Sequence, residues 1–200
     1  MLLIKFPVAI KNQLYITDTV NFYYPYILHS GSMNDINYDI YNNMIQLINA
    51  LLVPDLKTYI SGSYEIKTNE KGVLSLSLIG LAEFGGAHPN TIIKSLNYDL
   101  HRGRNEPLSQ QFLPNSNYVE ILSGMVYQQL QEQEIPLFDD FPGIDANQDY
   151  YIADKSLVIY FQLYQVAPYV AGFPYAVIPI YQIQELIRDD GLLGRMIGSV

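Results

Sequence analysis

The sequence predicts an α+β protein whose sheets are antiparallel and carry packed helices. Three observations indicate this class. Strand-like and helix-like segments follow one another as β-β-α-β-β-β and then α-β-β-β-α, without regular βαβ alternation. Residues 33–51 carry apolar side chains at spacings of three and four, as an amphipathic helix does. Residues 73–79 alternate apolar and small polar side chains, as a half-buried strand does.

The chain opens with two predicted strands and one helix. The strands are Leu2–Ile10 and Leu14–Leu28, and the second is rich in Tyr, Phe, Val and Thr. Turn chemistry at Ser30–Ser32 supplies an N-cap for the helix, which ends before Pro54. Its apolar stripe consists of Met33, Ile36, Ile40, Met44, Leu47, Ile48 and Leu51.

A three-stranded meander follows the helix. Its predicted strands are Leu56–Thr68, Val73–Ile79 and Thr91–Leu100. The turn Asn69–Gly72 joins the first two strands, and we expect Gly72 to adopt a positive φ there. Gly85–Pro89 connects the second strand to the third.

A polar segment, His101–Glu106, predicts a domain boundary. It divides the chain into a small N-terminal two-layer α+β domain, residues 1–104, and a C-terminal α+β domain, residues 105–200. The C-terminal domain starts with a short connector, 108–112, and a helix that Asn115 or Ser116 caps. That helix runs to about Glu134, and its apolar face consists of Val119, Leu122, Val126 and Leu130, with Pro136 as the stop.

The end of the chain predicts a Tyr-rich hairpin and a last helix. The hairpin, residues 149–164, turns at Ala153–Ser156, and a Pro/Gly/Tyr loop, Ala167–Pro174, leads to a third short strand at 175–179. Tyr181–Arg188 reads as a helix that Gly191 ends, and Leu192–Val200 reads as a frayed tail.

Composition excludes several function classes. The 200 residues are 49% hydrophobic and 16% charged, which does not fit a disordered chain. The net charge of −9 disfavours a nucleic-acid partner, which needs a basic face. Residues 105–154 contain nine carboxylates and no Lys or Arg. Two interpretations stay open: a solvated acidic face, or a docking surface for a basic partner.

The chain has no cysteine, which excludes disulfides, thiolate catalysis and Cys-based zinc sites. Its first ten residues are interrupted by Lys5 and Pro7 and do not predict a signal peptide. No run of about 18 apolar residues occurs, so we expect no membrane span and, for the sequence as written, a cytoplasmic protein.

Four segments together resemble a bacterial family of domains of unknown function: Gly85–Pro89, Ser95–Asp99, Phe112 with Asn117-Tyr118, and Asp149–Pro179. That family includes the extracellular domain of a lysozyme-binding anti-sigma factor and the non-catalytic part of a peptidoglycan deacetylase. The resemblance implies a two-part α+β fold and a binding or sensing module of the cell envelope, where the relatives lie outside the cytoplasm.

The ionisable residues do not assemble a catalytic set, a metal site or a cofactor site. The three histidines, His29, His88 and His101, lack the spacing of a helical zinc site. Asp145–Asp149 has the D-x-N-x-D spacing that begins a calcium loop. The rest of the loop does not fit, because Tyr150 stands where Gly is required and Ser156 stands where the bidentate Glu is required. An Asx-turn is therefore favoured. The neighbouring acids Asp139 and Asp140 say nothing about the separation that a glycosidase needs.

Aromatic residues are the remaining candidates for a binding site. We expect Tyr169 and Phe173 to be displayed on a loop that prolines and glycine stiffen. Tyr164, on or beside the hairpin, and His88 are the other candidates for contact with a ligand. The alternative is that His88 ties its own loop together and that the tyrosines, among them Tyr150 and Tyr160, only cover the sheet.

The function predicted from these residues is a non-enzymatic binding or sensing module for a cell-envelope protein, such as a lysozyme-like enzyme, or for a glycan. Two other classes stay open. One is a cell-wall sugar hydrolase or deacetylase, or an accessory domain of one, which needs metal ligands around His88. The other is a structural or oligomerisation protein, which needs a large exposed apolar patch.

Overall fold

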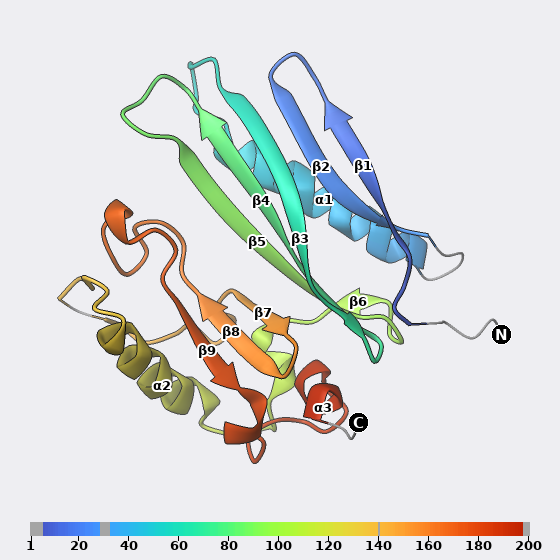
Figure 1. The fold of residues 1–200 in the computed structure, drawn as a ribbon, viewed down its shortest axis with the longest axis vertical. Coiled ribbons are helices and arrows are strands. Elements are labelled where there is room, and N and C mark those ends of the chain that lie inside the picture. The colour runs from blue at the N-terminus through green and yellow to red at the C-terminus, as the bar shows by residue number, and fades with distance from the viewer. Residues whose placement is uncertain (1–5, 29–32, 140, 198–200) are drawn as a thin grey trace. The chain divides into compact units, whose positions relative to one another are not determined.

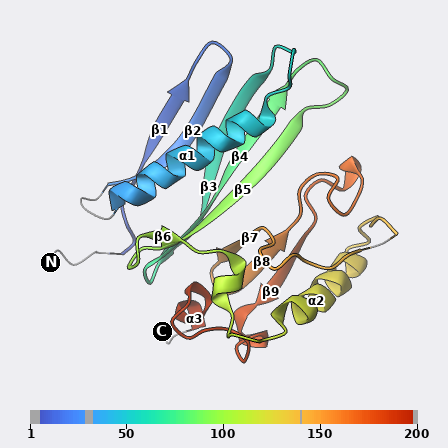
Figure 2. The ribbon, with the colours of Figure 1, turned by 180° about the vertical axis from the view of Figure 1, so that it is seen from behind.

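The computed structural model describes residues 6–28, 33–139 and 141–197. The chain divides into two compact units, Met1–Asn105 and Glu106–Val200. The first unit is a sheet with one helix on its face (Figures 1 and 2). Its elements are β1 (Ile10–Ile16), β2 (Val20–Ile27), α1 (Met33–Leu51), β3 (Tyr59–Glu70), β4 (Val73–Glu83), β5 (Asn90–Asp99) and β6 (Arg104–Asn105). The mixed α+β class predicted from the sequence is confirmed.

The six strands pair in their chain order, from β1 to β6. All neighbouring pairs are antiparallel except β2 and β3, which run parallel, with Val20 opposite Ile60. The expectation of wholly antiparallel sheets is therefore wrong at this pair. The cause is α1, which carries the chain back across the sheet before β3 begins, so that β2-α1-β3 is a crossover unit.

The first two strands differ from the prediction. Residues 6–9 are not part of a strand, residues 1–5 lie outside the described residues, and the predicted strand Leu14–Leu28 contains a turn. At this turn the Thr17 hydroxyl oxygen accepts hydrogen bonds from the backbone N–H groups of Thr19 (3.3 Å) and Val20 (3.1 Å). A threonine can form such a turn without glycine or proline, so the β-rich composition concealed it.

The predicted amphipathic helix is confirmed as α1. Its buried face contains all seven residues of the apolar stripe together with Asn37. The predicted N-cap, Ser30–Ser32, lies outside the described residues. Phe22 of β2 lies under this helix, fully buried, over a gap that Gly62 of β3 and Gly80 of β4 leave in the sheet. No helix among the described residues is long and apolar enough to cross a membrane.

The meander β3-β4-β5 is also confirmed. Gly72 at the first turn has a φ of 74°, as expected, and Lys71 before it also has a positive φ. On one face of β4 and β5, opposite residues are joined by side-chain hydrogen bonds, at 2.7 Å between Ser75 Oγ and Asn97 Oδ1 and at 2.9 Å between the hydroxyls of Ser77 and Ser95. These bonds satisfy polar groups that are buried in the structure.

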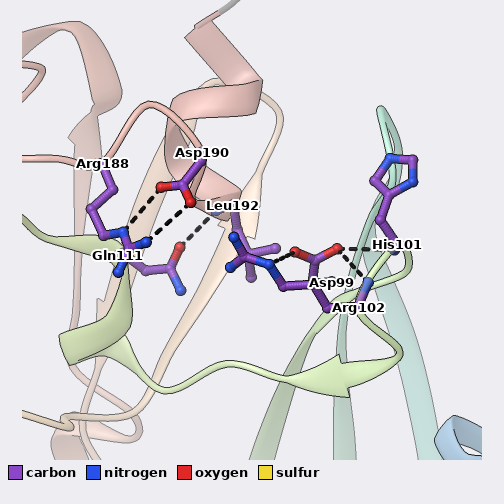
Figure 3. A network of polar contacts seen from close by, with 7 residues as sticks. All are labelled: Asp99, His101, Arg102, Gln111, Arg188, Asp190 and Leu192. Atoms are coloured by element: carbon purple, nitrogen blue, oxygen red, sulfur yellow. Dashed lines mark hydrogen bonds and ion pairs between the residues drawn. The ribbon is translucent and has the colours of Figure 1, made fainter.

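The turn after β5 is organised by the buried Asp99 (Figure 3). One of its carboxylate oxygens accepts the backbone N–H groups of His101 (2.9 Å) and Arg102 (3.1 Å), and the other lies 3.5 Å from Arg102 Nε. The neighbouring Tyr98 is buried on the opposite face, where its hydroxyl donates to Asp39 of α1 at 2.7 Å. Burial, then the Asp39 carboxylate, raises the pKa of Tyr98.

The second unit packs a three-stranded antiparallel sheet beside a helix (Figure 1). Its elements are the 3₁₀ turns Leu108–Gln111, Tyr169–Ala171 and Ile180–Gln182, the helices α2 (Tyr118–Glu132) and α3 (Leu192–Ile197), and the strands β7 (Tyr150–Ala153), β8 (Ser156–Tyr160) and β9 (Tyr175–Pro179). The predicted hairpin and third strand are thus confirmed.

The predicted N-cap of α2 is wrong, although Leu122, Val126 and Leu130 of its predicted apolar face are buried and Val119 is half-buried. The N-cap position is Asn117, not Asn115 or Ser116, and Asn115 has a φ of 63°. The helix ends at Glu132, and Gln133 is its C-cap. Glu134 then has a φ of 56°, and the N–H groups of Glu134 and Ile135 donate to the carbonyl oxygens of Gln131 and Leu130. This is the bonding of a Schellman motif, so the helix ends before Pro136 is reached.

The end of the chain also differs from the prediction. Tyr181–Arg188 is mostly turn, and the helix lies instead in the predicted frayed tail, where Leu192, Leu193 and Met196 are buried. The buried Gln111 explains this placement (Figure 3). Its side-chain oxygen accepts the Leu192 N–H at 2.8 Å, and its backbone oxygen accepts the Arg188 N–H at 2.9 Å. These tertiary bonds have no local signal in the sequence.

Candidate functional site

The candidate site is the loop of residues 161–174, which connects β8 to β9. At its base the Phe161 N–H donates to the Pro174 carbonyl oxygen at 2.9 Å. Pro168 starts a single 3₁₀ turn, and Gly172, with a φ of 66°, reverses the chain after it. Proline and glycine therefore set the shape of this loop, as the sequence predicts.

Glutamine side chains brace the first half of the loop. The buried Gln148 donates its amide to the Tyr160 carbonyl oxygen at 2.8 Å. Gln165 accepts the Gln162 N–H at 2.9 Å, and Gln162 donates to the Asp149 carboxylate at 2.9 Å. Three side-chain bonds to one short segment reduce the conformational freedom that binding would otherwise have to remove.

Buried residues anchor the middle of the same loop. Val166 and Ala167 are buried, and the Val166 carbonyl oxygen accepts the Phe138 N–H at 2.9 Å. The residues on either side of this anchor point outward: Tyr164 is 54% exposed and Val170 is 86% exposed. The loop therefore has a fixed centre and displayed flanks.

Two of the predicted binding residues come together. The rings of Tyr164 and Tyr169 lie 5.8 Å apart between centroids, at 36° to each other. Tyr164 has a φ of 64°, which few residues other than glycine adopt. Phe173, further along the loop, is half-buried, as is Tyr169. The two tyrosines and Val170 form a small aromatic and apolar surface, which we call the aromatic loop.

The hairpin tyrosines behave as the alternative interpretation expects. Tyr150 and Tyr160 are buried, and the Tyr150 hydroxyl donates to the Glu106 carbonyl oxygen at 2.8 Å. Burial first, and then the Glu106 carboxylate, raises the pKa of Tyr150. These two rings belong to the interior of the unit, in contrast to the exposed Tyr164 of the aromatic loop.

His88 lies in the first unit, in the loop between β4 and β5. Its side chain is exposed, its Nδ1 lies 3.3 Å from the Pro89 carbonyl oxygen, and Gly85 in the same loop has a φ of 80°. The structure thus places His88 in a different unit from Tyr164, Tyr169 and Phe173.

The Asx-turn predicted at Asp145 is confirmed, because its carboxylate accepts the Asn147 N–H at 2.8 Å. Within residues 6–28, 33–139 and 141–197, no group of three His, Asp or Glu side chains is placed to hold a metal ion. Of the acidic pair, Asp139 is exposed and Asp140 lies outside the described residues.

A second group of tyrosines lies in the first unit, on α1, β1 and β2. Tyr41 of the helix makes edge contacts with Tyr24 (5.9 Å between ring centroids) and Tyr15 (6.4 Å). The sequence indicates a Tyr-rich strand here, but only the crossover places that strand beside the helix. Spacing within either segment could not have identified this group.

One family model matches part of the second unit. Residues 112–181 match the family described as "Protein of unknown function (DUF3298)". The match contains α2, the three-stranded sheet and the aromatic loop. This match supports the resemblance to a family of domains of unknown function. A relationship to the anti-sigma factor and to the deacetylase stays an expectation.

Solved structures of DUF3298 proteins share the fold of the whole chain. A member from Bacteroides fragilis has a TM-score of 0.65 at 15% sequence identity, over 94% of this chain and 95% of its own. A DUF3298 family protein from Pseudomonas aeruginosa PAO1 has a TM-score of 0.60 at 13% identity, over 90% and 93%. A search of curated proteins gives no match.

Proposed function

We propose that this chain is a non-enzymatic binding module that recognises a protein partner through the aromatic loop. The observation that carries the proposal is the paired, partly exposed rings of Tyr164 and Tyr169 beside the exposed Val170, on a loop that glutamine side chains brace. Tyrosines supply large contact area at low entropic cost, and a pre-braced loop loses little further freedom on binding.

The partner that fits best carries a basic surface. The unit with the aromatic loop contains the stretch 106–154, with nine carboxylates and no Lys or Arg, and Glu120, Glu132, Glu134 and Asp154 of this stretch are exposed. Such a surface attracts a basic protein over distances near the Debye length. A lysozyme-like muramidase of the cell envelope has this character, and the family resemblance points to the same class.

The test is a calorimetric titration of the purified chain with a lysozyme-like muramidase, at about 50 and 300 mM salt. We expect saturable binding that weakens with salt, because the attraction is partly electrostatic. Soluble peptidoglycan fragments are titrated in parallel to separate a glycan ligand from a protein ligand. No binding at about 100 μM, which corresponds to only about −5.5 kcal/mol, would contradict the proposal.

A further inference from the structure

A cavity of about 460 Å³ opens between α1 and β2 in the first unit. None of its lining residues belongs to the unit that carries the aromatic loop. Tyrosine and asparagine side chains form its walls: Tyr24, Tyr26, Asn34, Asn37, Tyr38 and Tyr41.

The pleat of β2 and the pitch of α1 together produce this lining. Tyr24 and Tyr26 are two residues apart on the strand, so they point to the same face of the sheet. Tyr38 and Tyr41 are three apart on the helix and therefore neighbours on one flank, where they are 69% and 36% exposed. The cavity is thus open to solvent along the helix flank.

The rings form the sides of a trough, not a flat platform. The ring planes of Tyr41 and Tyr24 meet at 60°, and those of Tyr41 and Tyr15 at 67°, so neither pair is stacked flat. The floor includes the buried Asn37, whose amide is bonded in both directions to Ile27 of β2, at 2.7 and 3.0 Å. Asn37 therefore fixes the distance between helix and strand and also forms part of the floor.

The groups available to a ligand are uncharged phenols and amides, which can donate hydrogen bonds as well as accept them. The lining has no Asp, Glu, Lys, Arg or His. Burial, then Tyr41 and Tyr26, raises the pKa of Tyr24, so its hydroxyl keeps its proton at neutral pH. No hydrogen bond to the hydroxyl of Tyr24, Tyr26, Tyr38 or Tyr41 is present within the described part of the chain. A charged ligand would find no counter-charge here, whereas a ligand rich in carbonyl oxygens would find donors.

We propose that this cavity binds an extended, proline-rich segment of a protein partner. Proline has carbonyl acceptors and no N–H, so it matches a lining of phenol and amide donors. A polyproline II segment has three residues per turn, so its pyrrolidine rings line up as ridges along the helix. Aromatic-lined grooves are the usual receptors for such a segment. Because such a segment is already extended when free, it loses little conformational entropy on binding.

The experiment titrates the full chain with acetyl-decaproline-amide, followed by calorimetry and by the chemical shifts of the tyrosine rings. We expect saturable binding with a Kd below about 1 mM. Tyr38→Ala should weaken it at least 5-fold, and Tyr38→Phe less, because Phe keeps the ring and loses only the donor. Tyr23→Ala is the control, since Tyr23 lies on β2 of the same unit, is 46% exposed and does not line the cavity.

Three results would overturn the proposal: no binding of decaproline at 1 mM, an equal loss in Tyr23→Ala and Tyr38→Ala, or saturable binding of a neutral chito-oligosaccharide in the cavity in place of the peptide. Because Tyr38 is largely exposed, Tyr38→Ala should stay folded, and circular dichroism checks this. Tyr38→Ala should leave the muramidase titration unchanged, so failure here is distinguishable from failure of the aromatic loop.

Discussion

The contact between Phe22 and two glycines offers a sharp test of the fold of the first unit. Gly62 and Gly80 lie directly opposite each other on β3 and β4, and the fully buried Phe22 ring covers Gly62. A Cβ added at Gly62 would lie 2.1 Å from a ring carbon of Phe22, far inside van der Waals contact. The change Gly62→Ala therefore forces the ring, or the strand, to move.

The magnitude follows from two opposing effects. Forcing an extra methyl group into a packed core costs about 1–3 kcal/mol, and a clash with the body of a buried ring belongs at the upper end. Removing a glycine from a strand returns about 0.5–1 kcal/mol. We expect Gly62→Ala to lower the free energy of unfolding by about 2 kcal/mol.

Gly124→Ala is the matched control for this prediction. Gly124 lies inside α2, and nothing within 4 Å meets a Cβ built there, so helix propensity alone should raise stability by about 1 kcal/mol. Urea unfolding followed by circular dichroism measures the free energy of unfolding of both variants. Gly62→Ala affects the unfolding of the first unit, and Gly124→Ala that of the second. If Gly62→Ala matched or exceeded the wild-type stability, the packing of Phe22 described above would be wrong.

Three further predictions concern buried or strained groups. The pKa of Tyr98 is raised, so the stability that its protonated form contributes is complete below about pH 10 and falls above it by up to about 1.4 kcal/mol per pH unit; denaturant unfolding at pH 9 to 11.5 measures this. Glu134→Gly should stabilise α2 by about 0.5–1 kcal/mol in thermal unfolding, because glycine adopts the positive φ of 56° without strain. Gln111→Ala should cost about 1–3 kcal/mol in urea, because it leaves the buried Leu192 N–H without its acceptor.

Each of these has its own control. Tyr98→Phe should flatten the alkaline loss, and an unchanged slope would assign that loss to other groups. Glu134→Ala keeps the strained φ and should not reproduce the gain of the glycine variant. Gln110→Ala, at the exposed neighbouring position, should be nearly neutral, and a cost equal to that of Gln111→Ala would contradict the role given to the Gln111 side chain.

The sequence predicted those elements that carry their own periodic signal. The stripe of α1, the alternation of β4 and the turn at Gly72 are local patterns, and each appears in the structure. The errors arose where a tertiary contact decides the outcome. The last helix forms at Leu192–Ile197 because Gln111, about 80 positions earlier, accepts a bond there.

The candidate site divides in the same way. Pro168 and Gly172 mark a stiff loop in the sequence, and the structure has a 3₁₀ turn and a positive φ there. The bracing by Gln148 and Gln162 could not be predicted, since a glutamine has no preferred partner until the fold supplies one. The trough in the first unit depends on the crossover between β2 and β3. No local pattern in the sequence indicates that crossover.

The most direct test of the central claim compares two Tyr variants in the muramidase titration. The double change Tyr164→Ala and Tyr169→Ala removes the ring pair, whereas Tyr181→Ala removes a ring that is 68% exposed in the same unit but outside the loop. We predict at least a 10-fold rise in Kd for the double variant, equal to about 1.4 kcal/mol, and less than a 2-fold change for the control. Equal affinities for the double variant and the wild type would contradict the claim that the aromatic loop is the binding surface.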